Sequence, residues 1–541
     1  MQPPEAAVHQ TPSGASFPPD PARRAHWLTL LLLLVGGAAI RFIFLARKPF
    51  WFDECFSVEV ARMNWSNFFR LLWWREANMS LYYLLLRIWL RLEMQGGQSE
   101  FLIRALSVLI AVATIPAIYW LARLLYNRRV ALIAAALFAF NAYSVRYAQE
   151  ARSYALFLLL ATLSSGFLIA LLREPTRRNR VGYVIVSVLA VYAHFYALLL
   201  VAAHWLALRR LFKSQFSAAL SGQLRSAWIT IGIAVLPLLI FVAKTGAGPI
   251  RWIQKPTLGD VLELYRELAG GSNWALLIVF AIAGIVACNA AVFPAGTRWF
   301  SRKANTENAN QIGDQNGSSS RDKWRSQFLL LWLFFPVVLT VVLSFARPVF
   351  LSRYMIFCLP ALLILVAAGL ARLRQSWLLA AAITGILLLS WQGILFVYTH
   401  DFDNERDASV AAADFILDRA QPGDAVVFHI AGTRIPYEFA RSLKAGQNTA
   451  SSDFTQQLGP EILFPYHGTG LDYRDFTGKP TADFLRTSAP PHPRVWIMLM
   501  NNGPADNPDP TTVMLTHILP ESFPKVLRWQ FTRVEVRLYS K

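Results

Sequence analysis

Long apolar runs alternate with short polar stretches, most of them basic, from Trp27 to about residue 400. The first run extends to residue 46 and is ended by Lys48-Pro49. At 1.5 Å per residue, twenty residues of helix span a hydrocarbon layer of about 30 Å. Similar runs predict further membrane-spanning helices at residues 102–125, 130–146, 153–172, 227–243, 273–294, 326–345, 354–371 and 376–398.

The basic stretches between the runs predict which side of the membrane each loop occupies. Arginines cluster at residues 126–129, 173–180 and 209–213, and such clusters favour the cytoplasmic side. Residues 181–209 must then cross twice, with a turn near His194. The result is a bundle of about eleven spans over residues 27–398, with a mobile cytoplasmic loop at 297–325, the N-terminus in the cytoplasm and the C-terminus outside.

The first external loop, residues 47–101, contains two segments that favour the membrane surface. Residues 54–75 mix aromatic and charged positions, which is typical of a helix lying in the interface plane. Residues 81–92 are apolar but short and carry Arg87. A crossing there would put the basic loop at 126–129 outside, so we interpret this segment as a surface or re-entrant helix.

The two ends of the chain differ from the apolar middle. Residues 1–26 are rich in proline, alanine and small polar residues, which indicates a disordered cytoplasmic tail, with a cleaved signal peptide as the alternative. From Thr399 the composition becomes that of a globular domain. Helical spacing at 407–420 and strand-length runs at 425–430 and 495–500 predict a small α/β domain on the periplasmic side, over residues 399–541.

Composition supports a polytopic membrane protein that is mainly helical. The chain of 541 residues is 55% hydrophobic and only 16% charged. Its net charge of +19 comes from 52 basic and 33 acidic residues, but the basic residues lie in short loops. They indicate contact with membrane lipids or phosphate, and no nucleic acid. The three cysteines are far apart and predict neither a disulfide framework nor a metal site.

Two acidic motifs are predicted to lie at the outer membrane surface. Asp53 and Glu54 directly follow the first span, and Asp53 is either a chemical group or the N-cap of the next helix. Glu150 and Arg152, followed by Tyr154, stand at the outer end of another span. Their alternative role is an ordinary helix cap with an arginine reaching the interface.

Two basic or polar turns lie on the same predicted side. Arg347, Arg353 and Tyr354 form a short external hairpin, where the positive-inside rule disfavours arginine and a phosphate contact becomes the better explanation. His194 and Tyr196 mark a tight turn, where a lone histidine is more often structural. Arg41, inside the first span, either reaches the interface or places a cation near Asp53.

Carboxylates and arginines at the outer lipid edge fit sugar transfer from a lipid-linked donor. Nucleotide sugars are cytoplasmic, so transfer on the outer side requires a sugar carried across on a polyprenyl phosphate. A carboxylate would take the proton of the acceptor hydroxyl, and arginines would offset the charge of the departing phosphate. These residues thus predict a glycosyltransferase that acts on the outer side of its membrane, and the family resemblance given next implies that this is a bacterial inner (plasma) membrane. The acceptor would be a glycolipid, a polymer or a protein.

Several motifs, in this order, resemble bacterial members of glycosyltransferase family 39. They are Phe52-Asp53-Glu54, Leu81-Tyr82-Tyr83, residues 146–154, Ala193-His194-Phe195-Tyr196 and Ser352-Arg353-Tyr354. The family includes relatives of protein O-mannosyltransferases and of aminoarabinose transferases acting on lipid A, within the GT-C fold. The resemblance covers roughly residues 27–400.

The resemblance implies roles for the matching residues. Asp53 would be the catalytic base, with Glu54 assisting it or positioning the acceptor. The donor head group and phosphate would be bound by Glu150, Arg152, Tyr154, Arg347, Arg353 and Tyr354. Contacts to donor or acceptor would come from Tyr82, Tyr83, His194 and Tyr196. The chain departs from the family at Asn78-Met79-Ser80, where many relatives have His-Pro-Pro.

A metal ion is left unassigned, and two other classes of protein are the alternatives to an enzyme. Some GT-C enzymes bind a divalent metal near the acidic motif, but this sequence presents no ligand set that justifies assigning one. A lipid or oligosaccharide transporter or flippase would be expected to have internal repeats and broken helices around a polar site in mid-membrane, and the sequence suggests neither. A non-catalytic membrane protein that binds envelope polymer is the other alternative.

Overall fold

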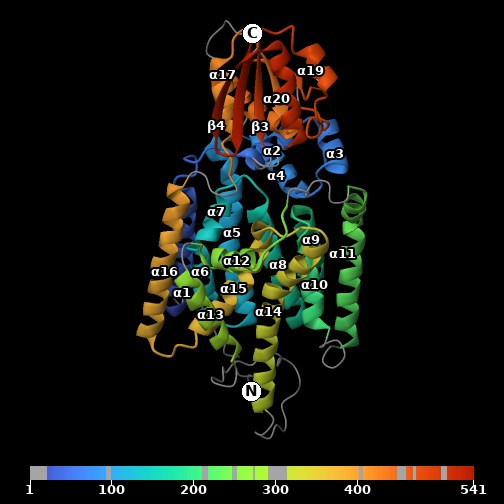
Figure 1. Cartoon of the computed structure of the whole chain (residues 1–541). Helices are drawn as coiled ribbons and strands as arrows, with labels where there is room; N and C mark the ends of the chain where they lie inside the picture. Colours follow the sequence, from blue (N-terminus) through green and yellow to red (C-terminus); the bar gives the residue numbers. More distant parts are fainter. Residues whose placement is uncertain are drawn as a thin grey trace, which may run out of the picture.

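The protein consists of a helical bundle with a small α/β domain stacked on one end (Figure 1). The computed structural model describes residues 21–92, 99–209, 217–245, 253–271, 274–289, 314–400, 406–447, 459–466, 471–500 and 509–541. The fold class predicted from the sequence is confirmed: the chain is mainly helical, and its C-terminal part carries a single sheet within the described residues.

Each run that was predicted to cross the membrane is helical, although the run at 130–146 is divided between two helices. The helices of the bundle are α1 (Pro21–Phe42), α5 (Glu100–Leu125), α6 (Arg128–Ala139), α7 (Ala142–Ala148), α8 (Tyr154–Arg173), α9 (Arg177–Ala193), α10 (Ala197–Leu208), α11 (Ala218–Thr245), α12 (Leu258–Ala269), α13 (Trp274–Cys288), α14 (Asp314–Ala346), α15 (Leu359–Leu370) and α16 (Ser376–Thr399). In the described part of the chain, six helical segments are long and apolar enough to cross a membrane. The bent pairs α6–α7 and α12–α13 raise that number to eight, and α1 and α10 are shorter apolar helices.

Contacts between helix ends agree with the predicted alternation of loops. His26 at the start of α1 lies 2.5 Å from the hydroxyl of Tyr119 near the end of α5. At the other end, the rings of Phe42 and Phe101 lie 5.8 Å apart. These helices are therefore antiparallel. Arg129 donates to the carbonyl of Leu373 at 2.9 Å, which brings two loops predicted to be cytoplasmic to the same end of the bundle.

The predicted span at 130–146 is broken, and Arg41 explains how the break is tolerated. Helices α6 and α7 meet at an angle of 57°. The guanidinium of Arg41 is fully buried and donates to the carbonyls of Phe138 and Ala139 at 3.1 and 2.8 Å, and also to the hydroxyl of Ser144. It satisfies carbonyls that the helix end leaves free. Neither interpretation given to Arg41 from the sequence is supported.

The loop predicted at 297–325 is shorter than expected. Residues 314–325 are helical and form the beginning of α14, whereas residues 297–313 lie outside the described part of the chain. Adding residues to an existing helix costs far less than starting one, so the apolar span extends into the polar sequence before it.

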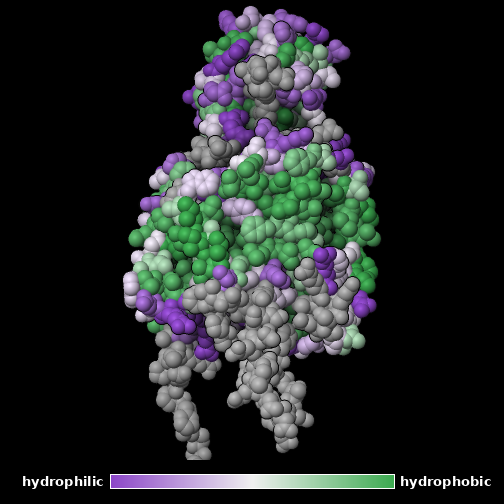
Figure 2. Space-filling view, turned by 60° about the horizontal axis from the view of Figure 1, so that its bottom comes forward, coloured by the Kyte–Doolittle hydropathy of each residue, from purple (hydrophilic) through white to green (hydrophobic). Residues whose placement is uncertain are grey.

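The face of the bundle seen in Figure 2 is apolar across its middle, with hydrophilic residues toward both ends. Large aliphatic and aromatic side chains of the bundle helices are exposed, including Ile233, Ile285, Phe345 and Leu388, each more than 60% exposed. A surface of this kind would be unstable in water but is suited to lipid.

The described residues of the segment 47–101, which was predicted to be the first external loop, form three helices between the bundle and the sheet (Figure 1). They are α2 (Phe52–Arg62), α3 (Trp65–Trp74) and α4 (Ser80–Leu92). Helix α3 buries Phe68 and Leu71 and exposes Trp65, Phe69 and Trp73, the pattern of a helix that lies in the membrane interface. The two surface segments predicted in this loop are thus helical.

The α/β domain is built on five strands in the order β2-β1-β3-β5-β4. The strands are β1 (Ala425–His429), β2 (Glu461–Phe464), β3 (Arg494–Met500), β4 (Lys525–Phe531) and β5 (Val534–Ser540), with helices α17 (Ser409–Arg419), α18 (Arg434–Gln447), α19 (Ala482–Ser488) and α20 (Pro510–Ser522). Strands β2, β1 and β3 are parallel, and β5 and β4 continue the sheet antiparallel. Because β5 ends at the far end of the molecule, the carboxyl ends of β1 and β3 point back toward the bundle (Figure 1).

One apolar core connects the two parts. Its buried side chains continue from the bundle through Phe50, just before α2, and Cys55 within α2 to Phe439 and Trp496 of the α/β domain. The rings of Phe50 and Phe439 stack at 4.9 Å. Helix α2, which carries the first acidic motif, is therefore held between the bundle and the sheet.

Candidate active site

Asp53 is the second residue of α2, and its carboxylate faces two arginines. The N-cap residue Trp51 has an extended backbone and makes no side-chain cap. Asp53 Oδ2 lies 3.5 Å from Nη2 of Arg152 and 3.6 Å from Nη2 of Arg353. The Asp53 side chain retains 19% exposure. Asp53 therefore does not cap its helix, and the sequence-based alternative that assigned it only this role is not supported.

The two arginines reach Asp53 from separate parts of the bundle. Arg152 comes from the loop between α7 and α8, and its Nη1 donates to Asp53 O and to Ser57 Oγ, both at 3.3 Å. Arg353 comes from a short 3₁₀ helix, η3 (Ser352–Cys358), which directly precedes α15. Both guanidiniums are more than 90% buried. These two guanidiniums share one carboxylate within 4 Å, and the nearby Glu76 is only partly ionised near neutral pH because burial raises its pKa to about 7. Positive charge therefore remains in excess, which favours an anionic ligand.

Glu76 is a second acid near this cluster, and sequence reasoning missed it. It lies in the turn between α3 and α4, and burial raises its pKa to about 7, which the nearby Asp53 also favours while Arg152 opposes it. A carboxyl group with a pKa near neutrality is able to exchange protons at physiological pH. The signal in the sequence was an acid five residues before Leu81-Tyr82-Tyr83, between the two segments that were predicted to lie at the membrane surface.

Aromatic side chains surround the charged cluster. The hydroxyl of Tyr83 is hydrogen-bonded to Arg152, and Arg353 lies 5.9 Å from the ring of Tyr354. The ring of His194 is fully buried and lies 4.7 Å from that of Tyr354 and 5.3 Å from that of Tyr196. The structure thus brings together side chains from four separate sequence motifs.

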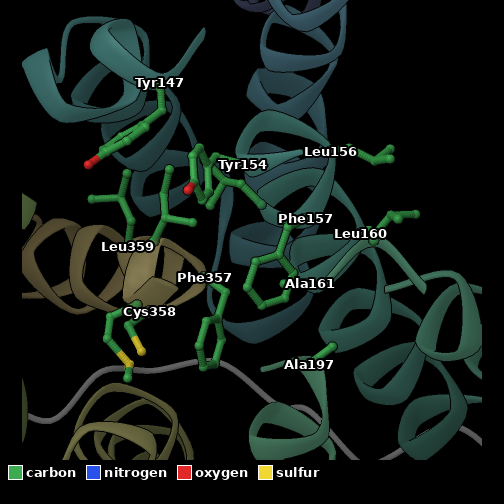
Figure 3. Close-up of a cluster of buried hydrophobic side chains, with 14 of the residues drawn as sticks. Tyr147, Tyr154, Leu156, Phe157, Leu160, Ala161, Ala197, Phe357, Cys358 and Leu359 are labelled. Carbon is green, nitrogen blue, oxygen red and sulfur yellow. The ribbon is translucent and has the colours of Figure 1, made fainter. Parts of the chain in front are cut away.

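An apolar layer supports these rings from the bundle side. Tyr154, Phe157 and Phe357 lie close together in Figure 3, and the rings of Phe157 and Phe357 are 5.0 Å apart. Phe157 also stacks on His194 at 4.9 Å. Well-packed neighbours of this kind restrict the rotamers of the residues that carry the charged groups.

Glu54 faces away from the cluster into a buried ion pair. Its two carboxylate oxygens accept from Arg104 Nε at 2.8 Å and from Nη2 at 2.6 Å. Oε1 also accepts from the backbone of Ala151 at 2.9 Å. Both Glu54 and Arg104 are fully buried. Arg104, which the sequence analysis did not select, also donates to the carbonyls of Leu45, Lys48 and Pro49.

Within the parts of the chain that the structure describes, three other predicted site residues, Glu150, Tyr82 and Arg347, form no hydrogen bond or ion pair with Asp53. Glu150 is buried and accepts from Arg406 Nη2 at 2.9 Å. The hydroxyl of Tyr82 lies 2.9 Å from Ser107 Oγ in the interior. Arg347 is exposed at the end of α14, and in the described ranges no ion pair joins it to Asp53.

The donor set around Asp53 does not fit a divalent metal. Among the described residues, no three or more His, Cys, Asp or Glu side chains are placed to hold one. Asp53 and Glu76 share their surroundings with Arg152, whose positive charge would repel a cation.

Comparisons with solved structures identify the fold. The chain superposes on ArnT from Cupriavidus metallidurans bound to undecaprenyl phosphate with a TM-score of 0.55 and 11% identity, covering 95% of this chain and 98% of that one. The apo state of the same protein matches with a TM-score of 0.55 and 12% identity over the same shares of both chains. The archaeal oligosaccharyltransferase AglB from Archaeoglobus fulgidus, in complex with an inhibitory peptide and a dolichol-phosphate, matches with a TM-score of 0.46 and 11% identity, covering 77% of this chain and 63% of that one.

Sequence comparisons add nothing to this result, because no protein-family model and no curated protein matches the chain. At about 11% identity, the likeness concerns the arrangement of the backbone over nearly the whole chain. The chain has a GT-C-like fold, as its sequence motifs predicted.

Proposed function

We propose that this protein is an integral membrane glycosyltransferase that moves a sugar from a polyprenyl-phosphate donor to an acceptor outside the cytoplasm. The observation that carries the proposal is Asp53 between the buried guanidiniums of Arg152 and Arg353, at 3.5 and 3.6 Å. The cluster lies where the apolar bundle meets the α/β domain. A ligand with an isoprenoid tail and a phosphate needs an apolar surface for the tail and a positively charged site for the phosphate, next to each other.

The excess positive charge suggests how the donor would bind. Without a ligand, the carboxylate of Asp53 is the counter-ion of both arginines. A lipid phosphate carries charge that two guanidiniums recognise well, because each presents several N–H donors in one plane. We infer that the phosphate takes over Arg152 and Arg353 on binding, which leaves Asp53 able to accept a proton.

The reaction would be a single displacement. The acceptor hydroxyl oxygen attacks the anomeric carbon while its proton passes to Asp53. The bond between that carbon and the phosphate oxygen breaks, and its electron pair stays on the departing lipid phosphate. Arg152 and Arg353 stabilise the charge that develops on this oxygen, and they do so more strongly in a buried site than in water.

Other predicted residues fit supporting roles. Tyr83, Tyr154, Tyr354 and Tyr196, with His194, would shape the space around the sugar and the phosphate. Glu54 would position α2 through Arg104 instead of touching the acceptor, since its oxygens are already occupied. The mechanism uses no metal. The membrane is proposed to be a bacterial inner membrane with the α/β domain on the periplasmic side. The acceptor would be a glycolipid, a polymer or a protein.

The test compares the envelope of a deletion strain with that of strains complemented by variants. Mass spectrometry of the glycolipids, glycoproteins and lipid-linked sugars of the deletion strain should show one missing sugar and an accumulated polyprenyl-phosphate donor. The wild-type gene should restore the sugar, and Asp53→Asn, which has the same shape but is a far weaker base, should not. Asp418→Asn is the matched control, because this carboxylate is 60% exposed in the α/β domain.

The outcomes separate the three function classes. Transfer by Asp53→Asn at the wild-type rate would exclude Asp53 as the base. An unmodified lipid-linked donor trapped on the cytoplasmic side would support a flippase. A normal set of envelope sugars in the deletion strain would leave the envelope-binding alternative and end the proposal of an enzyme. Variant protein levels in the membrane should match the wild type throughout.

A further inference from the structure

The segment that enters the α/β domain is buried against α2 and the loop that carries Arg152. Arg406 and Asp407 directly precede α17, and each is only 2% exposed. Charged residues in connecting segments are ordinarily on the surface. Two adjacent buried charges in such a segment therefore need partners, and both partners lie in the catalytic part of the chain.

Asp407 supplies the cap that α2 lacks. The backbone N–H of Phe52, at the start of α2, lies 3.3 Å from both Oδ1 and Oδ2 of Asp407. Oδ1 also accepts from the backbone N–H of Ser409, at the start of α17, at 3.1 Å. A helix N-terminus carries unpaired N–H groups and partial positive charge, which a carboxylate satisfies. One side chain thus caps two helices that are more than 350 residues apart in sequence.

Arg406 holds the other side of the site. Its Nη2 donates to Glu150 Oε1 at 2.9 Å, with both side chains buried. Glu150 is two residues before Arg152, and the amide of Ala151 between them is bound by Glu54. The pair Arg406–Asp407 therefore contacts both the helix that carries Asp53 and the loop that carries Arg152.

Packing of the α/β domain reinforces these contacts. Phe439 of α18 stacks on Phe50 at 4.9 Å, and Phe476 meets the edge of Phe56 at 5.2 Å. Arg62 at the end of α2 donates to Ser442 Oγ at 3.0 Å. Helix α2 is thus fixed at its N-terminus by Asp407 and along its length by the domain above it.

We propose that Asp407 is a positioning residue for sugar transfer: by capping α2 from the C-terminal segment, it sets the place of Asp53 relative to Arg152 and Arg353. This inference rests on the proposed function, because it takes Asp53 to be the reacting group. Displacement of a catalytic group by about 1 Å can slow a reaction by about 100-fold. A loss of the cap should therefore appear in the turnover rate.

The experiment uses the full-length protein purified in detergent, with the lipid extract of the deletion strain as the source of donor and acceptor. Asp407→Ala removes the carboxylate that accepts hydrogen bonds from the N-termini of α2 and α17, and it should lower the initial rate of transfer per folded molecule at least 10-fold. Asp407→Asn keeps an oxygen that caps helices about as well as aspartate does, and it should stay within about threefold of the wild type with an unchanged pH profile. Asp407→Glu keeps the buried charge but displaces the carboxylate by one methylene, so it should also slow transfer.

Hydrogen exchange gives a readout that does not depend on the sugar. The amides of Phe52 to Cys55 should exchange at least 10-fold faster in Asp407→Ala than in the wild type. Thr481→Ala is the matched control, because Thr481 caps α19 by accepting from Phe484 N at 3.3 Å, in the α/β domain and away from α2. It should change neither the exchange of α2 nor the rate.

Failure of this inference is distinct from failure of the proposed function. If α2 in Asp407→Ala exchanges like the wild type, the cap does not hold the helix and the inference is wrong. If Asp407→Asn loses as much activity as Asp407→Ala while α2 stays protected, the carboxylate acts by its charge, and positioning is refuted. If the wild-type protein transfers no sugar in the assay with the deletion-strain extract, the proposed function is wrong. The hydrogen-exchange result still decides whether Asp407 fixes α2.

Discussion

Replacement of Glu54 by glutamine is the sharpest test of how the site is held. Glu54 accepts three hydrogen bonds, two from Arg104 and one from the amide of Ala151. Glutamine has nearly the same shape, but one carboxylate oxygen becomes an NH₂ group. That NH₂ must point at an N–H donor of Arg104 or at the amide of Ala151, so the variant loses at least one hydrogen bond and the charge that balances a buried guanidinium.

The magnitude follows from burial. Arg104 and Glu54 have 1% and 0% side-chain exposure, so water cannot replace the lost partner. Breaking one side of a buried ion pair costs about 3 to 5 kcal/mol. Because every 1.4 kcal/mol is about a factor of ten, the unfolding equilibrium should shift by about two to nearly four powers of ten. This is a large part of the about 5 to 15 kcal/mol that stabilises a typical domain.

The assay is thermal unfolding of the purified protein, followed by tryptophan fluorescence, together with the transfer rate per folded molecule. Glu54→Gln should lower Tm by several degrees. Glu521→Gln is the matched control, because Glu521 binds Arg486 in the same two-pronged way, at 3.1 and 3.0 Å, but both side chains are about half exposed. The control should keep the wild-type Tm.

Two results would refute this reasoning. A Glu54→Gln protein with the wild-type Tm would show that the buried pair does not stabilise the first external loop. A variant with the wild-type Tm whose transfer is abolished as fully as in Asp53→Asn would place Glu54 in the chemistry itself, as the sequence motif suggested.

Three further predictions concern other contacts of the same region. Because burial raises the pKa of Glu76 from 4.5 to about 7, the folded protein binds a proton at this residue more tightly than the unfolded chain. The free energy of unfolding should therefore fall by up to about 3 kcal/mol as the pH rises from 4.5 to 7, and Glu76→Gln should remove this part of the pH dependence of Tm. Arg41→Met should lower Tm in the same assay, by the equivalent of about 2 to 4 kcal/mol, since it uncovers the carbonyls at the break between α6 and α7; an unchanged Tm would contradict this. Asn78→Ala should slow transfer severalfold, because Asn78 Oδ1 accepts from the amide of Phe195 at 3.1 Å and so orders the turn that carries His194. A wild-type initial rate in this variant would show that the turn does not depend on Asn78.

The motifs selected from the sequence were brought together only in part. Asp53, Arg152 and Arg353 do meet, and each had been chosen because it was predicted to lie at the outer surface of the membrane, next to the end of a span. Glu54 and Glu150 were chosen on the same grounds, but each is held by an arginine of its own, Arg104 and Arg406. Local sequence does not distinguish an acid that faces a site from one that pairs in the interior, because the partner comes from a distant segment.

Glu76 and Asp407 were missed for a related reason. Glu76 stands beside Trp73, Trp74 and Arg75, a context typical of a polar residue on a surface helix. Its unusual pKa comes from burial near Asp53, which exists only once the loop has folded. Asp407 lies outside every motif, and its role depends on a contact with Phe52.

What the sequence determined by itself was the long apolar helices of the bundle and the ends at which their loops lie. Apolar length, basic loops and the change of composition near Thr399 are local properties, and a membrane leaves the backbone of such runs few alternatives to helix. What only the tertiary structure decided was the pairing of the charges. Arg41 binds carbonyls of a broken helix, Arg104 pairs with Glu54, Arg406 pairs with Glu150 and Asp407 caps α2. Each buried charged group binds the polar or oppositely charged group that the packing brings within hydrogen-bond distance.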